Sequence, residues 1–217
     1  LLCLGIAGLV MAWVLYPPEN RYSPMRCTIS YLGSPDADRN PAGWRVYQVG
    51  MTALLLWMAD LLVLRHRRGV ARWASPGGMA TLTLALGLAM ILMTVWIPDS
   101  RSGRLFGMTS GQFHTRIALC GIPILGLGVV LDAAAHLRAG GGLRSLWPFH
   151  LYAGVSAFGF HQLMEWEWLC REDRSLRHWP GDGLHSTPLW EWIFFVGLML
   201  HWSWMARRRE PRSGASG

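Results

Sequence analysis

Residues 77–97 form an apolar segment that contains no charged side chain. A helix rises about 1.5 Å per residue, so about twenty apolar residues are needed to cross a hydrocarbon core about 30 Å thick. A helix on the surface of a soluble bundle would carry charged side chains on its solvent face, and this segment has none. The segment therefore predicts a transmembrane helix.

Five further apolar segments approach or reach the same length. Together the six predict an all-α fold, an integral membrane bundle of about six transmembrane helices. We expect one transmembrane domain over residues 1–206 and a basic, disordered cytoplasmic tail over residues 207–217. The first helix is expected to be truncated, because the chain begins inside it. The six segments are residues 1–16, 46–64, 77–97, 117–135, 147–170 and 188–206.

The composition agrees with a membrane protein and argues against a nucleic-acid binder. Hydrophobic residues make up 52% of the 217 residues and charged residues only 15%, against about 25% charged in soluble domains. The formal net charge is +7, and every basic residue is an arginine. The arginines lie between apolar segments, as in residues 65–72 and 207–212, where they would meet lipid headgroups. Membrane lipids are therefore the predicted partners, and nucleic acid is not.

The arginine distribution predicts an orientation. Compact arginine clusters with few acidic residues occupy residues 65–72, 138–144 and the C-terminal tail. The longer loops at residues 17–45, 98–116 and 171–187 mix arginine with aspartate and glutamate. Because basic residues concentrate in cytoplasmic loops, we expect both termini to be cytoplasmic and the longer loops to face outward.

Common cofactor and catalytic motifs are missing from the sequence. It has no P-loop, no glycine-rich dinucleotide fingerprint, no GxSxG elbow and no haem attachment motif. Its four cysteines show no CxxC spacing, so they indicate neither a metal knuckle nor a disulfide framework. The sequence excludes nucleotide-driven transport and indicates no cofactor or oligomeric state.

The long first loop, residues 22–44, is rich in turn-forming residues but also carries Ile29, Tyr31 and Leu32. A plain connector would not need these apolar anchors. We expect the loop to pack on the outer mouth of the bundle; alternatively, its polar residues are ordinary turn formers. The candidate polar contacts are Ser30, Asp36 and Asn40.

Two stretches of the sequence are similar to a known family. TISYLGSPDADRNPAGW (residues 28–44), followed by an apolar helix, and WIPDSRSGRLFGMTSGQFHTRIA (residues 96–118) resemble the bacterial DUF998 family of membrane proteins. The last third of the chain departs from the family pattern, because Gly183 and Leu184 are followed only by Glu191 with no arginine beside it. The resemblance implies a multi-pass protein of the bacterial cytoplasmic (inner) membrane and no particular chemistry. A more distant similarity to the Frag1 and DRAM group of six-helix proteins suggests lipid-linked work by analogy alone.

A carboxylate and an imidazole are expected to meet at the outer interface. Asp99 follows the third predicted helix and His114 opens the fourth. Together they could hold a proton, a metal or a headgroup, and His185 from the last outer loop would complete a set of zinc ligands. None of the three has HxxxH or HExxH spacing. A structural cap at the helix start is the alternative.

His161 and Glu165 lie four residues apart in the fifth predicted helix, hence on one face. Ionisable groups within a membrane span usually face the bundle interior or a watery cavity. We therefore expect this pair inside the bundle; alternatively, Glu165 is solvated near the outer interface and His161 has a structural hydrogen bond. The candidate catalytic residues are Asp99, His114, His161 and Glu165.

These residues favour an outward-facing polar pocket covered by the first loop. One hypothesis is that the pocket binds a lipid headgroup, with the Arg116 guanidinium on the phosphate. The second is a membrane-embedded lipid hydrolase, metal-assisted through Asp99 and His114, and the third is a small transporter in which His161 and Glu165 relay protons. The expected pocket residues are Asp99, His114, Glu165 and Glu191, and the candidate ligand-binding residues are Ser30, Asn40, Arg116 and Glu191.

Overall fold

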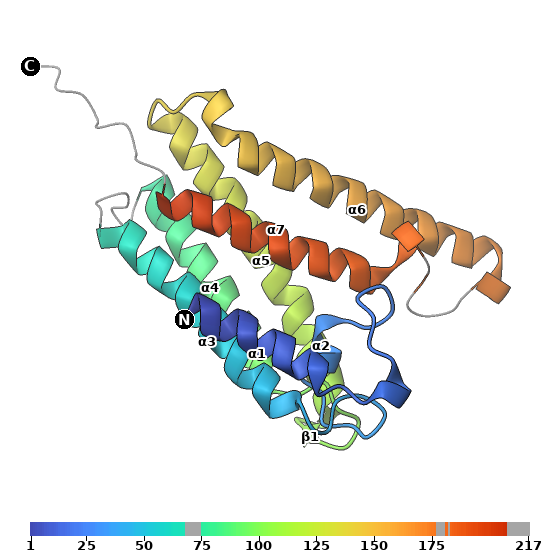
Figure 1. Ribbon diagram of the computed structural model, residues 1–217. Coiled ribbons are helices and arrows are strands. Elements are labelled where there is room, and N and C mark those ends of the chain that lie inside the picture. Colours follow the sequence, from blue (N-terminus) through green and yellow to red (C-terminus); the bar gives the residue numbers. More distant parts are fainter. Residues whose placement is uncertain (68–74, 177–180, 182, 208–217) are drawn as a thin grey trace, which may run out of the picture.

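The computed structural model describes residues 1–67, 75–176, 181 and 183–207, and within them the fold is all-α, as predicted (Figure 1). Each predicted apolar segment lies largely within one long helix. The predicted C-terminal tail lies outside the described residues, apart from Arg207. The α-helices are α1 (Leu2–Val14), α2 (Ile29–Leu32), α3 (Trp44–Arg65), α4 (Pro76–Trp96), α5 (Ser110–Arg138), α6 (Trp147–Glu172) and α7 (Thr187–Arg207).

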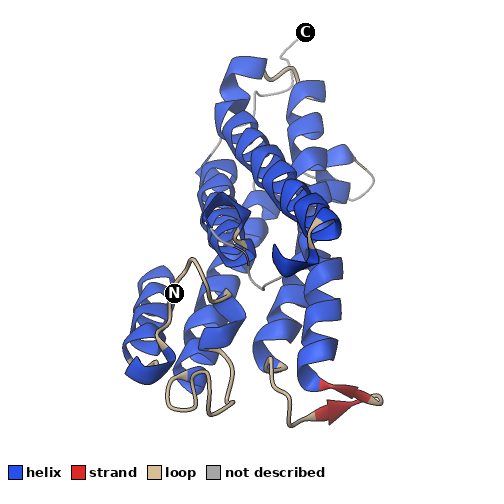
Figure 2. Ribbon diagram, turned by 90° about the vertical axis from the view of Figure 1, so that its right-hand side faces the viewer, coloured by secondary structure: helices blue, strands red, loops and turns tan. Residues whose placement is uncertain are grey.

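Short elements connect these helices. A small antiparallel hairpin, β1 (Arg104–Leu105) and β2 (Met108–Thr109), precedes α5, with Arg104 opposite Thr109. Figures 1 and 2 show this hairpin at the same end of the bundle as the long loop between α1 and α3. The short 3-10 helices are η1 (Pro18–Asn20), η3 (Leu143–Leu146), η4 (Arg174–Leu176) and η5 (Gly183–His185).

Three of the helices meet the length and composition that a membrane crossing requires. Among the described residues these are α3, α4 and α5, and α1 is a shorter apolar helix of 13 residues. The start of α4 is set locally, because the Ser75 hydroxyl accepts a hydrogen bond from the Gly78 N–H and Pro76 occupies the first helical position. The uncharged segment that predicted a transmembrane helix is therefore a single uninterrupted helix.

The pair α4 and α5 forms the most closely packed part of the bundle. A β-carbon placed on Gly128 would lie 2.7 Å from Leu84 Cγ, and one placed on Gly87 would lie 2.7 Å from Leu125 Cγ. Each glycine thus packs directly against a leucine side chain of the opposite helix. Small residues allow such close approach where lipid supplies no hydrophobic force between helices.

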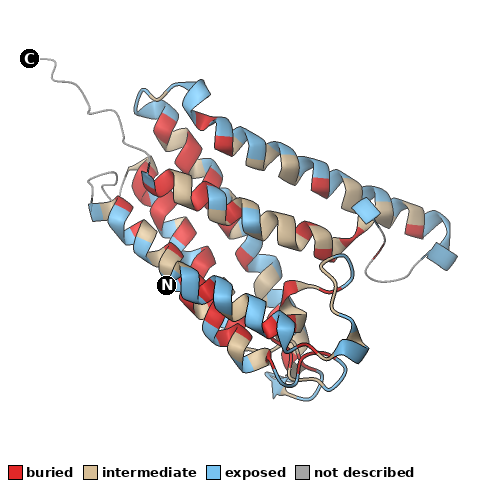
Figure 3. Ribbon diagram, in the orientation of Figure 1, coloured by how far each residue is buried: buried red, intermediate tan, exposed pale blue. Residues whose placement is uncertain are grey.

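Helix α6 lies at the edge of the bundle and packs chiefly against α7. In this fully described helix only Pro148, Gly159 and Cys170 are buried (Figure 3). Gly159 lies against the Trp190 ring, where a β-carbon would come within 2.4 Å of Cε3. The remaining surface of α6 is half-buried or exposed.

A buried polar network joins three helices at the end opposite the long loop. The Arg65 guanidinium on α3 forms an ion pair with Asp132 on α5, and both side chains are almost fully buried. Arg65 Nη1 also lies 2.7 Å from Met205 Sδ on α7. Nearby, the Trp202 indole N–H donates to the Met58 carbonyl oxygen at 2.9 Å. These contacts fix α3, α5 and α7 relative to one another.

Replacing Asp132 with alanine is expected to destabilise the protein by about 3–5 kcal/mol, because it leaves the Arg65 guanidinium buried without its counter-charge. The control is Glu167→Ala, which removes the exposed i,i+4 partner of Arg171 on α6 and should cost less than about 1 kcal/mol. Denaturant titration in detergent micelles measures both. Equal losses would show that the buried pair does not hold the helices together.

Candidate functional site

The loop between α1 and α3 is fastened to the bundle by a buried asparagine. The Asn40 amide nitrogen donates to the carbonyl oxygens of Ala12 at 3.0 Å and Leu32 at 2.9 Å. Its amide oxygen accepts the Gly43 N–H at 3.0 Å, just before α3 begins. Asn40 was a candidate for ligand binding, but its side chain is fully buried and engaged by the protein. Its role here is to hold the loop.

Asp99, which follows α4, is the main anchor of the same loop. Its carboxylate lies 2.7 Å from the Arg39 guanidinium, in an ion pair that is largely shielded from solvent. Its backbone carbonyl accepts hydrogen bonds from Arg39 at 2.7 Å and from the Ser34 hydroxyl at 2.6 Å. The guanidinium also lies 4.0 Å above the Tyr31 ring. Asp36 adds a further tie by accepting the Ser100 hydroxyl at 2.6 Å.

A second set of contacts ties the loop to the start of α7. The Trp192 indole N–H donates to the Tyr22 hydroxyl at 3.0 Å, and that hydroxyl reaches the Thr28 carbonyl at 3.4 Å. Burial raises the pKa of the Tyr22 phenol far above its ordinary value, so the hydroxyl stays protonated. The Ser186 hydroxyl also donates to the Met25 carbonyl oxygen at 2.5 Å.

Beneath this loop lies a cavity of about 130 Å³, which we call the chamber. It is enclosed by α2, α3, α4, α5 and α7, with further lining from Tyr152 of α6. Most of its wall is apolar, with Met51, Met58 and Leu125 among the lining residues. Its side chains with polar atoms are Ser30, Tyr47, Thr94, His114, Tyr152 and Glu191.

Glu191 is the acidic group of the chamber. One carboxylate oxygen accepts the Ile29 N–H of α2 at 3.0 Å, so the loop and α7 meet at this side chain. Ser30 follows directly, and its hydroxyl lies 2.8 Å from the Thr28 hydroxyl and 3.5 Å from the Asp99 carboxylate. Of the expected pocket residues, His114 and Glu191 line this cavity together with the ligand-binding candidate Ser30, whereas Asp99 and Glu165 do not line it.

His114 is held in one orientation by the end of α4. Thr109 and Gln112 form a capping box that starts α5, which places His114 in the second turn of the helix. His114 Nδ1 lies 3.0 Å from the Thr94 carbonyl oxygen and 2.8 Å from that of Ile97. Carbonyl oxygens only accept, so Nδ1 carries a proton and donates it to these oxygens.

Arg116 does not line the chamber, contrary to its expected role as a phosphate ligand. Two residues along a helix correspond to about 200° of rotation, so Arg116 projects away from the face that carries His114. Its side chain is exposed. Among the described residues that line the chamber there is no arginine.

The proposed zinc ligands Asp99, His114 and His185 are not brought together. Asp99 is paired with Arg39, whereas the His185 ring stacks on Trp166 with centroids 5.4 Å apart. Within the described ranges no group of three His, Cys, Asp or Glu side chains is placed to hold a metal ion.

His161 and Glu165 are exposed on α6 and do not face the bundle interior. The Gln162 amide contacts both, lying 3.3 Å from His161 Nδ1 and 3.2 Å from Glu165 Oε2. His185 Nε2 lies 3.5 Å from the same Glu165 oxygen. The face of α6 that contacts α7 carries Gly159. His161 and Glu165 lie on a different face, outside this contact. Glu165 is therefore not part of the chamber.

Two residues that shape the site, Tyr47 and Arg39, were not among the residues predicted from the sequence. Tyr47 lines the chamber on the same helical stripe as Met51, Leu54 and Met58, at intervals of three to four residues. This spacing is visible in the sequence and could have placed Tyr47 on the buried face of α3. Arg39 lies between Asp38 and Asn40 in an irregular loop, where no periodicity indicates its partner.

Neither family models nor curated proteins nor solved structures gave a match to this chain. The resemblance to the DUF998 family therefore stays a prediction.

The substitution Asn40→Asp is expected to destabilise the loop, because aspartate cannot donate to the Ala12 and Leu32 carbonyl oxygens and turns a negative charge toward them. Two lost buried hydrogen bonds correspond to about 2–5 kcal/mol. Asn20→Asp is a matched control, since the Asn20 amide also donates to two carbonyl oxygens, those of Ala37 and Arg39, in a more exposed place. Thermal unfolding in detergent should separate the two variants clearly, and equal melting temperatures would contradict this role of Asn40.

Proposed function

We propose that this chain is a multi-pass membrane protein that binds an amphipathic molecule, with the polar end of that molecule in the chamber beside Glu191. In this proposal all six long helices cross or enter the bilayer and the loop between α1 and α3 lies on the outer side. The apolar composition and the three helices that meet the length for a crossing support it. The arginine clusters support the orientation.

The observation that carries the proposal is the kind of groups that line the chamber. The carboxyl group of Glu191 lies among hydroxyl groups and an imidazole, and the described lining contains no arginine or lysine. In a site shielded from water a carboxyl group favours ammonium and hydroxyl donors, and no arginine or lysine of the described lining would offset the charge of a phosphate or carboxylate. We therefore infer a ligand whose polar end is an amine or an alcohol, in place of the phosphate expected from Arg116.

The apolar wall of the chamber supports a hydrocarbon portion in the same ligand. Met51 and Met58 lie next to leucine and phenylalanine side chains, and methionine adapts its shape to different apolar ligands. Binding sites for small molecules commonly combine such a wall with a few polar groups that fix orientation. The chamber has this arrangement.

The contacts of Asp99 and His114, the two candidate catalytic residues nearest the chamber, favour binding over hydrolysis. Asp99 contacts Arg39 and Ser30, while His114 Nδ1 is directed at two backbone carbonyl oxygens. In the described part of the chain these two residues act separately as anchors of the loop and of α5.

A series of amphiphiles with equal chain length tests the proposal. A long-chain amine should raise the melting temperature of the purified protein most, the corresponding alcohol less, and the carboxylic acid not at all. A ligand at a hundred times its Kd stabilises the folded state by about 2.7 kcal/mol. Differential scanning fluorimetry in a fixed detergent measures the three shifts.

The substitution Glu191→Gln should abolish the preference for the amine over the alcohol, because it removes the acidic group that can form an ion pair with an ammonium. The glutamine carbonyl can still accept the Ile29 N–H, so the loop should stay in place. Glu167→Gln on the exposed side of α6 serves as the control and should keep the preference. Equal stabilisation by the amine and the acid, or an unchanged preference in Glu191→Gln, would overturn the proposal.

A further inference from the structure

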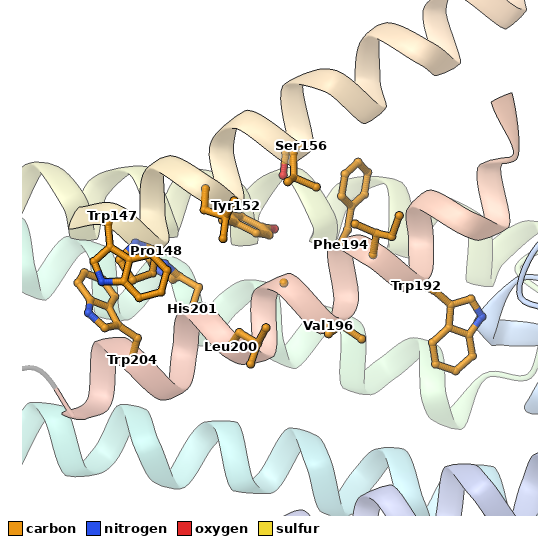
Figure 4. Close-up of a pocket in the computed structure, with 14 residues that line it drawn as sticks. Trp147, Pro148, Tyr152, Ser156, Trp192, Phe194, Val196, Leu200, His201 and Trp204 are labelled. Carbon is orange, nitrogen blue, oxygen red and sulfur yellow. The ribbon is translucent and has the colours of Figure 1, made fainter. Parts of the chain in front are cut away.

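A second cavity lies between α6 and α7, and we call it the groove (Figure 4). Its volume is about 590 Å³. Trp147 and Trp204 lie at one end and Trp192 at the other, and the groove between them is lined mainly by apolar side chains. His201 lies beside the first two, with its ring 5.4 Å from that of Trp204.

The chamber is too small to hold a whole amphiphile. Sites for small molecules commonly measure about 300–1,000 Å³, and the chamber has only about 130 Å³. The groove lies within the common range. A ligand with its polar end at Glu191 therefore needs further space for its chain.

The two cavities meet at two aromatic side chains. Tyr152 of α6 and Phe194 of α7 line both the chamber and the groove. Tyr152 can lie close to α7 because Gly197 faces it, where a β-carbon would come within 2.9 Å of the Tyr152 ring. The Tyr152 ring is also stacked against His201, with centroids 6.0 Å apart. The Tyr152 and Phe194 rings therefore form the boundary between the chamber and the groove.

The groove is open on the side away from the bundle. Val196 and Leu200, which line it, are 49% and 68% exposed. In a membrane this side would face the hydrocarbon of the bilayer. Helix α6 packs closely against α7 through Gly159 and Trp190 near one end and through Tyr152 and Gly197 further along. The groove is thus open on one side and shares Tyr152 and Phe194 with the chamber.

We propose that the groove holds the hydrocarbon chain of the molecule whose polar end lies in the chamber, and that this chain enters from the bilayer between α6 and α7. The inference rests on the proposed function. Along α7, Glu191 and Trp204 are separated by about 20 Å of helical rise, which gives room for a long alkyl or prenyl chain. Trp147 and Trp204 close the far end and would limit the chain length that fits.

A photoreactive probe tests the route. The probe is a long-chain primary amine with a diazirine at the end of its chain, added to the purified full-length protein in micelles. Irradiation and peptide mass spectrometry should place the label on residues 147–156 and 196–204. Label confined to α4 or α5 would overturn the proposed route even if the amine stabilises the protein through Glu191.

Variants that fill the groove provide the second measurement. Val196→Trp should weaken binding of the long-chain amine about tenfold, or about 1.4 kcal/mol, while a short-chain amine should bind as before. The matched control is Val130→Trp on α5, because Val130 is 53% exposed and does not line the groove. Leu200→Trp and Leu119→Trp form a second pair, with 68% and 67% exposure, in case the first variant does not fold.

The outcomes separate the two proposals. Loss of long-chain binding in both groove variants, with both controls unchanged, supports the route. Unchanged binding in folded groove variants overturns the route and leaves the chamber proposal standing. If neither amine binds the unmodified protein, the chamber proposal fails and the route fails with it.

Discussion

The ion pair between Arg39 and Asp99 sets the position of the first loop, and the contacts of Glu191 depend on that position. The pair is largely shielded from water, and the Asp99 carbonyl accepts two more hydrogen bonds from the loop. With the loop in place, the Ile29 N–H reaches Glu191 and Ser30 lines the chamber. Charge-assisted hydrogen bonds of this kind are short and directional. They therefore hold the long loop between α1 and α3 in one position above the chamber.

The sequence predicted the helices well because apolar length is a local property. Residues 77–97 correspond to α4, whose start is fixed by Ser75 and Pro76. It also placed Asp99, His114 and Glu191 at one end of the bundle, since each lies near a predicted helix end, and Ser30 in the loop expected to cover that end. Periodicity shows which residues share a face, but it does not show which face is covered. Arg116 and the pair on α6, His161 and Glu165, therefore could not be assigned to the interior or exterior from sequence alone.

The chamber and the groove have complementary physical properties. The chamber offers a carboxyl group and hydrogen-bonding groups in little space, whereas the groove offers more apolar space and has exposed side chains along its wall. A molecule with a polar end and a long chain matches both. The buried Arg65–Asp132 pair fixes α3 and α5 at the opposite end, while α6 has few buried residues. Elements with few buried contacts open at low free-energy cost, which suits a helix beside an entry route.

Mass spectrometry of the protein purified from membranes in a mild detergent would show whether Glu191 holds the polar end of an amphiphile. We expect a retained amphiphile with a long chain and an amine or alcohol end group, bound to wild-type protein and reduced in Glu191→Gln. Val130→Trp should retain it at the wild-type level. Retention of only phosphate-bearing lipids, or equal retention of one amphiphile by wild type and Glu191→Gln, would show that Glu191 does not select the bound molecule.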